Sequence, residues 1–212
     1  MNLPVIILGG GGHAKVLIEA LRASGVTILG ITDSDPAKQN TSVMGIPVLG
    51  DDAEVERHAP ENVLLVNGLG SVEQPTVRAA IFDAFVARGY SFATVVHPSA
   101  VVASDVRMDK GVQIMAGAVI QPGCAIGANT VVNTHTTVDH DCNLAGHVHL
   151  APGAVLSGGV TVGEATHVGA GTTIIQGVRL GARVLIGAGS LVTQDMPDGV
   201  TAYGIPAKVV KK

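Results

Sequence analysis

The chain has 212 residues, with 13 basic and 17 acidic side chains that give a formal net charge of −4. This mildly acidic balance argues against a protein that binds nucleic acid or a membrane surface. Although 47% of the residues are hydrophobic, no apolar run approaches the ~20 residues of a membrane-spanning helix, and no signal-peptide pattern is present. The two cysteines form no metal-type CxxC pair. We therefore expect a cytoplasmic protein without membrane insertion.

Residues 1–95 alternate short apolar runs with helical patterns, which is typical of an α/β unit with a parallel sheet. We expect strands at 5–8, 27–33 and 62–68, an apolar run at 44–50, and helices at 13–24, 53–58 and 75–88. The first helix should pack through one face, formed by Ala14, Leu17, Ala20 and Leu21. The last helix should bury Val77, Ile81 and Phe85, and Gly25 and Gly89 follow the two long helices as stop signals.

From Val102 onward the period of the sequence changes to six. One aliphatic residue recurs at every sixth position, sixteen times in succession: Val102, Met108, Ile114, Ile120, Ile126, Val132, Val138, Leu144, Leu150, Leu156, Val162, Val168, Ile174, Leu180, Ile186 and Val192. This period indicates a solenoid of short strands and bends that stack around a shared core. Three hexads would close one coil, so residues 18 apart should lie about 4.8 Å apart, in roughly five coils. We assign this solenoid to residues 96–197 and a C-terminal cap to 198–212.

The solenoid resembles the hexapeptide-repeat acyltransferases, as does the segment "GIPAK" (204–208) after "DMPDG". That resemblance implies a left-handed parallel β-helix and a homotrimer. Together with "GGGGHAK", "TDSDP", "VNGLGS", "HPSA" and "VDHDC", the chain is similar to bacterial nucleotide-sugar acetyltransferases. The implied fold is a small Rossmann-like domain followed by the β-helix. The implied activity is acetyl-CoA-dependent N-acetylation of a nucleotide-linked 4-amino sugar in surface glycan biosynthesis, with sialic acid-type O-acetylation as the alternative.

The glycine loop of "ILGGGGHAK" stands between a strand and a helix, where backbone N–H groups can approach a phosphate. Its G-x-G-x-x-A spacing alone is a weak dinucleotide signal, because this domain holds too few strands for the complete dinucleotide fold. The resemblance implies a nucleotide-sugar site formed by Gly11, Gly12, His13, Asp33, Ser34 and Gly68. Whether the nucleotide base is uracil or guanine stays open. The bacillosamine-type enzymes have a shorter segment before the arginine, which leaves the role of Arg78 and the identity of the sugar open as well.

Acyl transfer to an amine needs a base for the amine proton and a donor for the oxyanion. His140 titrates near neutral pH, and a neighbouring carboxylate can orient its ring. The resemblance assigns the base to His140, its partner to Asp141 and the oxyanion contact to Gly158. The rival partner is Asp139. The 18-residue register also places Gly158 one coil beyond His140.

The resemblance places acetyl-CoA in the groove between neighbouring β-helices. The implied contacts are His149, Ala170 and Ala188, and Lys208 could meet the CoA phosphates. The 18-residue register should place His149 over His167, a pairing explained only by its proximity to that groove. We expect His135, His147 and His167 to have no role in the site. Cys124 and Cys142 are 18 apart and should be reduced core residues.

Two other classes of function remain. A γ-carbonic-anhydrase-type hydratase would use His135 and His140, which have the five-residue separation of its metal ligands, but Ser99 stands where a third ligand is expected. A noncatalytic nucleotide-sugar sensor would keep "GGGGH" without needing His140 and Asp141.

Overall fold

The computed structural model describes residues 3–71 and 76–211. The N-terminal part forms a sheet with the strand order β3-β4-β2-β1-β5. Strand β1 pairs in parallel with β2 and β5, β2 pairs in parallel with β4, and β3 joins β4 as an antiparallel edge. The elements are β1 (Val5–Leu8), α1 (Gly12–Ala23), β2 (Ile28–Thr32), the 3₁₀ helix η1 (Pro36–Lys38), β3 (Ser42–Val43), β4 (Ile46–Gly50), the 3₁₀ helix η2 (Asp52–Arg57), β5 (Leu64–Asn67) and α2 (Thr76–Ala87).

The predicted parallel α/β unit is confirmed. Helix α1 buries the predicted face and also Ile18. It ends at Ala23, and Gly25 follows the C-cap with a φ of 67°, the left-handed conformation that glycine adopts without strain. No helix within residues 3–71 and 76–211 is long and apolar enough to cross a bilayer.

The predicted inner face of α2 was wrong at Val77, whose side chain is 64% exposed. Arg78, Phe82 and Phe85 are buried instead. Arg78 turns inward because its Nη1 donates hydrogen bonds to the backbone carbonyls of Asn67 and Leu69, each at 2.8 Å. Buried carbonyls need such donors, so hydrogen bonding overrides the apolar pattern here. Pro75, where this helix was expected to begin, lies outside the described residues.

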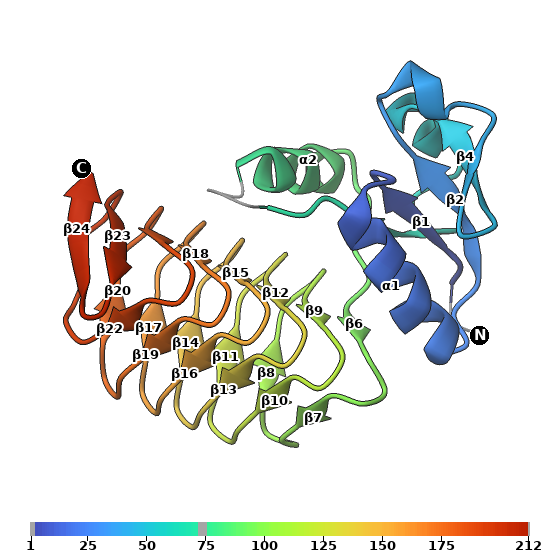
Figure 1. Cartoon of the computed structure of the whole chain (residues 1–212). Helices are drawn as coiled ribbons and strands as arrows, with labels where there is room; N and C mark the ends of the chain where they lie inside the picture. The colour runs from blue at the N-terminus through green and yellow to red at the C-terminus, as the bar shows by residue number, and fades with distance from the viewer. Residues whose placement is uncertain (1–2, 72–75, 212) are drawn as a thin grey trace.

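The second part is a β-helix whose coils run away from the N-terminal domain (Figure 1). Its strands form three sheets, in which strands three apart along the chain are neighbours. They are β6 (Val95–Val96), β7 (Val101–Val102), β8 (Arg107–Met108), β9 (Gln113–Ile114), β10 (Val119–Ile120), β11 (Ala125–Ile126), β12 (Val131–Val132), β13 (Thr137–Val138), β14 (Asn143–Leu144), β15 (His149–Leu150), β16 (Val155–Leu156), β17 (Thr161–Val162), β18 (His167–Val168), β19 (Thr173–Ile174), β20 (Arg179–Leu180), β21 (Leu185–Ile186) and β22 (Leu191–Val192).

The predicted register of 18 is confirmed, since Val138 pairs with Ile120 on one side and Leu156 on the other. Each of the sixteen aliphatic residues occupies the second position of its strand, and those from Ile114 onward are buried. Cys124 and Cys142 are buried free thiols, and each donates a hydrogen bond to a backbone carbonyl 15 residues further along. The repeat therefore sets both the core and the spacing of the coils.

The C-terminal segment extends one of the three sheets. Strand β23 (Thr201–Gly204) pairs in parallel with β21, and β24 (Ala207–Lys211) folds back antiparallel to β23. This hairpin lies at the end of the β-helix opposite the N-terminal domain (Figure 1).

Candidate functional site

His140 and Asp141 occupy a turn between β13 and β14, at a corner of the β-helix. Nδ1 of His140 and Oδ2 of Asp141 are 2.8 Å apart. Asp139 does not contact the ring in this way, and its Oδ1 accepts a hydrogen bond from the backbone N–H of His140 at 2.8 Å. Asp141 therefore orients the imidazole, and Asp139 holds the backbone beneath it.

Nε2 of His140 is the nitrogen with a lone pair. An ionised carboxylate only accepts hydrogen bonds, so the Nδ1 atom facing Asp141 carries the proton of the neutral ring. Nε2 lies against Gly158, because a Cβ built on that glycine would be 2.5 Å from Nε2 and from Cε1. Within the described residues the Gly158 N–H makes no hydrogen bond. A base and a backbone donor thus lie side by side at this corner.

Charge around His140 favours its protonated form. The hydrogen bond to Asp141 raises the pKa of His140 above its usual value, and the negative charge of Asp139 adds to the effect. Both side chains are open to solvent, with 54% of the His140 side chain and 73% of the Asp141 side chain exposed. The pair can therefore take up a proton and meet another molecule.

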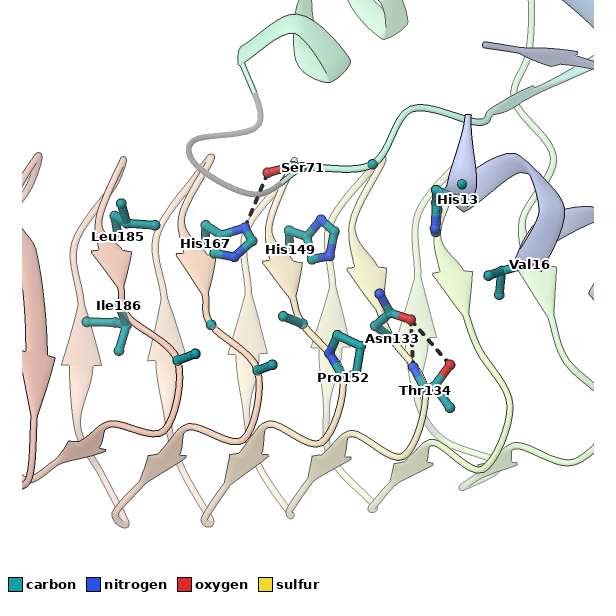
Figure 2. Close-up of a pocket in the computed structure, with 16 residues that line it drawn as sticks. His13, Val16, Ser71, Asn133, Thr134, His149, Pro152, His167, Leu185 and Ile186 are labelled. Carbon is teal, nitrogen blue, oxygen red and sulfur yellow. Dashed lines mark hydrogen bonds between the residues drawn. The ribbon is translucent and has the colours of Figure 1, made fainter. Parts of the chain in front are cut away.

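A cavity of about 680 Å³ lies between the N-terminal domain and the β-helix (Figure 2). It brings residues of two predicted groups into one place: Gly12 and His13 of the nucleotide-sugar group, and His149, Ala170 and Ala188 of the acetyl-CoA group. The other lining residues are Val16, Gly70, Ser71, Asn133, Thr134, Ala151, Pro152, His167, Gly169, Leu185 and Ile186.

The 18-residue register explains how the β-helix builds its side of the cavity. His149, His167 and Leu185 are successive neighbours in one sheet. The turns that follow this sheet supply a second column, which consists of Thr134, Pro152, Ala170 and Ala188. Ala170 and Ala188, both predicted acetyl-CoA contacts, are 18 residues apart, and the same register continued toward the N-terminus reaches Pro152 and Thr134.

Three histidine rings lie in a row along this cavity (Figure 2). The centroids of His13 and His149 are 6.5 Å apart, and those of His149 and His167 are 4.9 Å apart. Ser71 Oγ lies 3.2 Å from Nδ1 of His167, which links the segment after β5 to the β-helix. The expectation that His167 has no part in a site does not fit this position. Burial lowers the pKa of all three, to about 4 for His13 and about 2 for His149, so the row is uncharged at neutral pH.

The other predicted nucleotide residues surround the start of α1. Gly11 is the N-cap of this helix and has no side chain to cap it, so the first N–H groups of α1 are open. Asp33 follows β2, and its Oδ2 accepts hydrogen bonds from the Gly10 N–H at 2.8 Å and from Lys38 Nζ at 2.7 Å. Ser34 is exposed beside it. Gly68 is buried, and a Cβ there would lie 2.5 Å from the Gly9 carbonyl oxygen, so packing alone requires glycine.

Several predicted residues do not line the cavity. His140, Asp141 and Gly158 lie on a different corner of the same β-helix, and Lys208 is exposed on β24. Within a single chain, the predicted base His140 therefore lies apart from the cavity that the predicted acetyl-CoA contacts line.

Comparisons with known proteins agree with this architecture. The family model of the PglD N-terminal domain matches residues 4–85, and no curated protein matches the chain. The solved perosamine N-acetyltransferase from Caulobacter crescentus, in complex with CoA and GDP-perosamine, is 41% identical over 99% of this chain and 97% of that chain, with a TM-score of 0.92. The acetyltransferase domain of PglB from Neisseria gonorrhoeae, in complex with acetyl coenzyme A, is 36% identical over 99% and 100%, with a TM-score of 0.91.

This chain belongs to the family of hexapeptide-repeat nucleotide-sugar N-acetyltransferases. WeeI from Acinetobacter baumannii, 22% identical over 99% of this chain and 100% of that chain, shares the fold with a TM-score of 0.88. The predicted fold class, a small Rossmann-like domain followed by a hexapeptide-repeat β-helix, is confirmed.

Arg78 joins the two parts of this acetyltransferase. Its Nη1 donates to the carbonyls of Asn67, the last residue of β5, and of Leu69, and its Nε donates to the Asn129 carbonyl of the β-helix at 3.4 Å. Nδ2 of Asn67 donates to Asn129 Oδ1 at 3.2 Å, and Nδ2 of Asn129 lies 3.0 Å from Nδ1 of His147. The open question about Arg78 thus has a structural answer, because its side chain is 2% exposed at the junction.

The two histidines of the hydratase alternative lie on turns after different sheets. The ring of His135 lies against Gly117, where a Cβ would come within 2.7 Å of it. Among residues 3–71 and 76–211, no three His, Cys, Asp or Glu side chains are grouped so that they could hold a metal ion.

Proposed function

We propose that the protein transfers the acetyl group of acetyl-CoA to the amino group of a nucleotide-linked 4-amino sugar. The solved relatives bind CoA with GDP-perosamine, or acetyl coenzyme A. The observation in this chain that carries the proposal is the arrangement of His140 Nδ1 on Asp141, with Nε2 against Gly158. This arrangement supplies a base and an oxyanion donor, the two groups that aminolysis of a thioester needs.

The chemistry follows from these positions. The sugar amine attacks the thioester carbonyl carbon and forms the C–N bond while His140 Nε2 takes a proton from the amine nitrogen. The Gly158 N–H stabilises the oxyanion of the tetrahedral intermediate. When the C–S bond breaks, the imidazolium returns its proton to the CoA sulfur. Asp141 stabilises the imidazolium and keeps the proton on Nδ1 throughout.

The substrates are proposed to bind at the two sides of the cavity. The open N–H groups at the start of α1 suit the diphosphate, near Gly11, Gly12 and His13, with Asp33, Ser34 and Gly68 around the base and ribose. Acetyl-CoA would contact His149, Ala170 and Ala188, and Lys208 would meet its phosphates. The exposed positions of Ala170, Ala188 and Lys208 are compatible with a long ligand that passes along the surface.

We further propose a homotrimer in which His140 of one subunit completes the cavity of its neighbour. The support is geometric: His140 and the cavity lie on different corners of one β-helix, and the His140 side chain is 54% exposed. A shared site makes a direct prediction. His140→Ala and Ala188→Arg should each abolish turnover, because one removes the base and the other fills the donor column.

Mixed trimers test this arrangement. If the site is shared, refolding the two inactive variants together should restore part of the activity, since some interfaces then combine an intact His140 with an intact cavity. A mixture that stays inactive while forming mixed trimers would place each complete site within one chain. The activity itself is tested by acetyl-CoA consumption with UDP- and GDP-linked 4-amino sugars, after a thermal-shift screen for binding. An O-acetyl product, identified by its lability to mild base, would contradict N-acetylation.

A further inference from the structure

Gln113 connects the N-terminal domain to the β-helix at the edge of the cavity. This residue begins β9, and its side chain is 1% exposed. Its Oε1 lies 2.8 Å from Nε2 of His13, and its Nε2 donates to the carbonyl of Asn67 at 2.8 Å. One amide of the β-helix therefore contacts both the start of α1 and the end of β5.

The orientation of this amide is fixed by its neighbours. A backbone carbonyl oxygen only accepts hydrogen bonds, so the NH₂ group of Gln113 must face the Asn67 carbonyl. The amide oxygen then faces His13, and an amide oxygen only accepts. His13 must therefore carry a hydrogen on Nε2.

This assignment determines the other ring nitrogen as well. Burial lowers the pKa of His13 to about 4, so its ring is neutral at physiological pH and holds one hydrogen. With that hydrogen on Nε2, Nδ1 carries a lone pair and can only accept. Nδ1 makes no hydrogen bond to another described residue, and it is not among the described polar atoms that are closed off from solvent. Since His13 lines the cavity, this acceptor is available to a ligand there.

We infer that Gln113 is a positioning residue that fixes His13 in its Nε2–H form, so that Nδ1 accepts a hydrogen bond from a hydroxyl or amine group of the bound sugar. The ligand's identity rests on the proposed function, whereas the assignment of the tautomer does not. A phosphate oxygen is excluded as the partner, because an ionised phosphate diester has no hydrogen to donate. The diphosphate then belongs at the open N–H groups of α1, and the sugar belongs beside His13 on the side of His149.

The tautomer can be measured directly on the wild-type protein. Long-range ¹H–¹⁵N correlation spectra of the ¹⁵N-labelled protein distinguish protonated from bare ring nitrogens, and the His13→Asn spectrum assigns the signal. We expect one neutral form with the proton on Nε2 between pH 6 and 8. A proton on Nδ1, or a mixture of the two forms, would overturn the inference whether or not the protein acetylates a sugar.

Two variants extend the test to the ligand. Gln113→Leu removes the acceptor, so His13 should populate both tautomers and KM for the nucleotide sugar should rise about three- to tenfold, as expected for one lost hydrogen bond. KM for acetyl-CoA should stay unchanged. Gln113→Glu still accepts from Nε2–H. Its ionised carboxylate cannot donate to the Asn67 carbonyl, but Arg78 Nη1 still donates there at 2.8 Å. The variant should therefore keep the tautomer and most of the sugar affinity, and it should raise the pH at which His13 titrates.

Gln121→Leu is the matched control, because this glutamine is exposed directly after β10 of the same β-helix and should change neither spectrum nor KM. If His13 populates both tautomers in Gln113→Leu while KM for the nucleotide sugar stays unchanged, the contact between His13 Nδ1 and the sugar is refuted. If Gln113→Leu does not fold, the wild-type tautomer and the shifted titration in Gln113→Glu decide the question.

Discussion

The imidazole of His140 rests on the α-carbon of Gly158, one coil further along the β-helix. A Cβ at residue 158 would lie 2.5 Å from Nε2 and Cε1 of the ring, which is well inside van der Waals contact. The Gly159 N–H donates to the His140 carbonyl at 2.8 Å, so the turns that carry His140 and Gly158 cannot move apart without breaking this hydrogen bond. Glycine at 158 is therefore what allows the ring to lie over the backbone.

Replacing Gly158 with valine should displace the His140 ring and remove it from the proposed oxyanion donor. Loss of one oxyanion donor typically lowers turnover by about two to three orders of magnitude, and we expect kcat to fall by at least the lower value. Acetyl-CoA consumption measures this. Gly146→Ala is the control, because a Cβ there would meet its nearest neighbour at an ordinary 3.5 Å. Normal kcat in Gly158→Val would contradict the proposed geometry.

The two aspartates beside His140 should affect the pH profile differently. The base must be neutral to accept a proton, so activity should decline as the pH falls through the raised pKa of His140. Asp141→Asn removes the largest cause of that raised pKa and should move the acid limb to lower pH while reducing the plateau. Asp139→Asn removes only a nearby charge and should move the limb less. An equal shift in both variants would show that Asp141 has no special contact with the ring.

The row of buried histidines should make the fold sensitive to acid. Their folded pKa values lie below the ordinary 6.5, with about 4 for His13 and about 2 for His149. Below pH 6.5 the unfolded chain therefore binds more protons than the folded chain, and stability falls as the pH falls toward 4. Each such group contributes a slope of up to about 1.4 kcal/mol per pH unit.

His149→Phe tests this slope. The variant keeps a ring at this position and removes one titrating group, together with a buried Nδ1 that has no partner among the described residues. Denaturant unfolding between pH 4 and 7 should show a shallower loss of stability. His135→Gln, at an exposed turn, should retain the wild-type slope. If the wild-type protein loses stability steeply as the pH falls and His149→Phe loses it equally steeply, then His149 is not a cause of the acid sensitivity.

Arg78→Met should weaken the junction between the two parts of the chain. The carbonyls of Leu69 and Asn129 lose their donor, whereas the Asn67 carbonyl keeps the hydrogen bond from Gln113. Buried acceptors left without a donor cost about 1–3 kcal/mol each before relaxation. We expect a loss of about 2–4 kcal/mol in the free energy of unfolding. Arg88→Met provides the contrast, because Arg88 forms an exposed ion pair with Glu56 and should cost about 1 kcal/mol or less. Similar losses in both variants would show that the buried carbonyls do not depend on Arg78.

The fold could be predicted from the sequence because its repeats are local. An aliphatic residue at every sixth position can be buried in only one way, so Val138 and Leu156 had to be neighbours. Helix α2 shows where this reasoning fails. Val77 fits an apolar stripe, but Arg78 is buried instead because it donates hydrogen bonds to the carbonyls of Asn67 and Leu69. The pattern within the helix carries no information about the position of these acceptors, which belong to another segment.

The sequence by itself determined the hexad frame, the turn that carries His140 and the proximity of Gly158, since all three follow from a fixed period. Only the tertiary structure decided which aspartate touches the imidazole, that His167 joins His13 and His149 along one cavity, and that Gln113 contacts His13. These contacts depend on how the N-terminal domain packs against the β-helix and on the direction of individual side chains. Both are set by packing and hydrogen bonds between residues far apart in the chain, such as the 100-residue separation of His13 and Gln113.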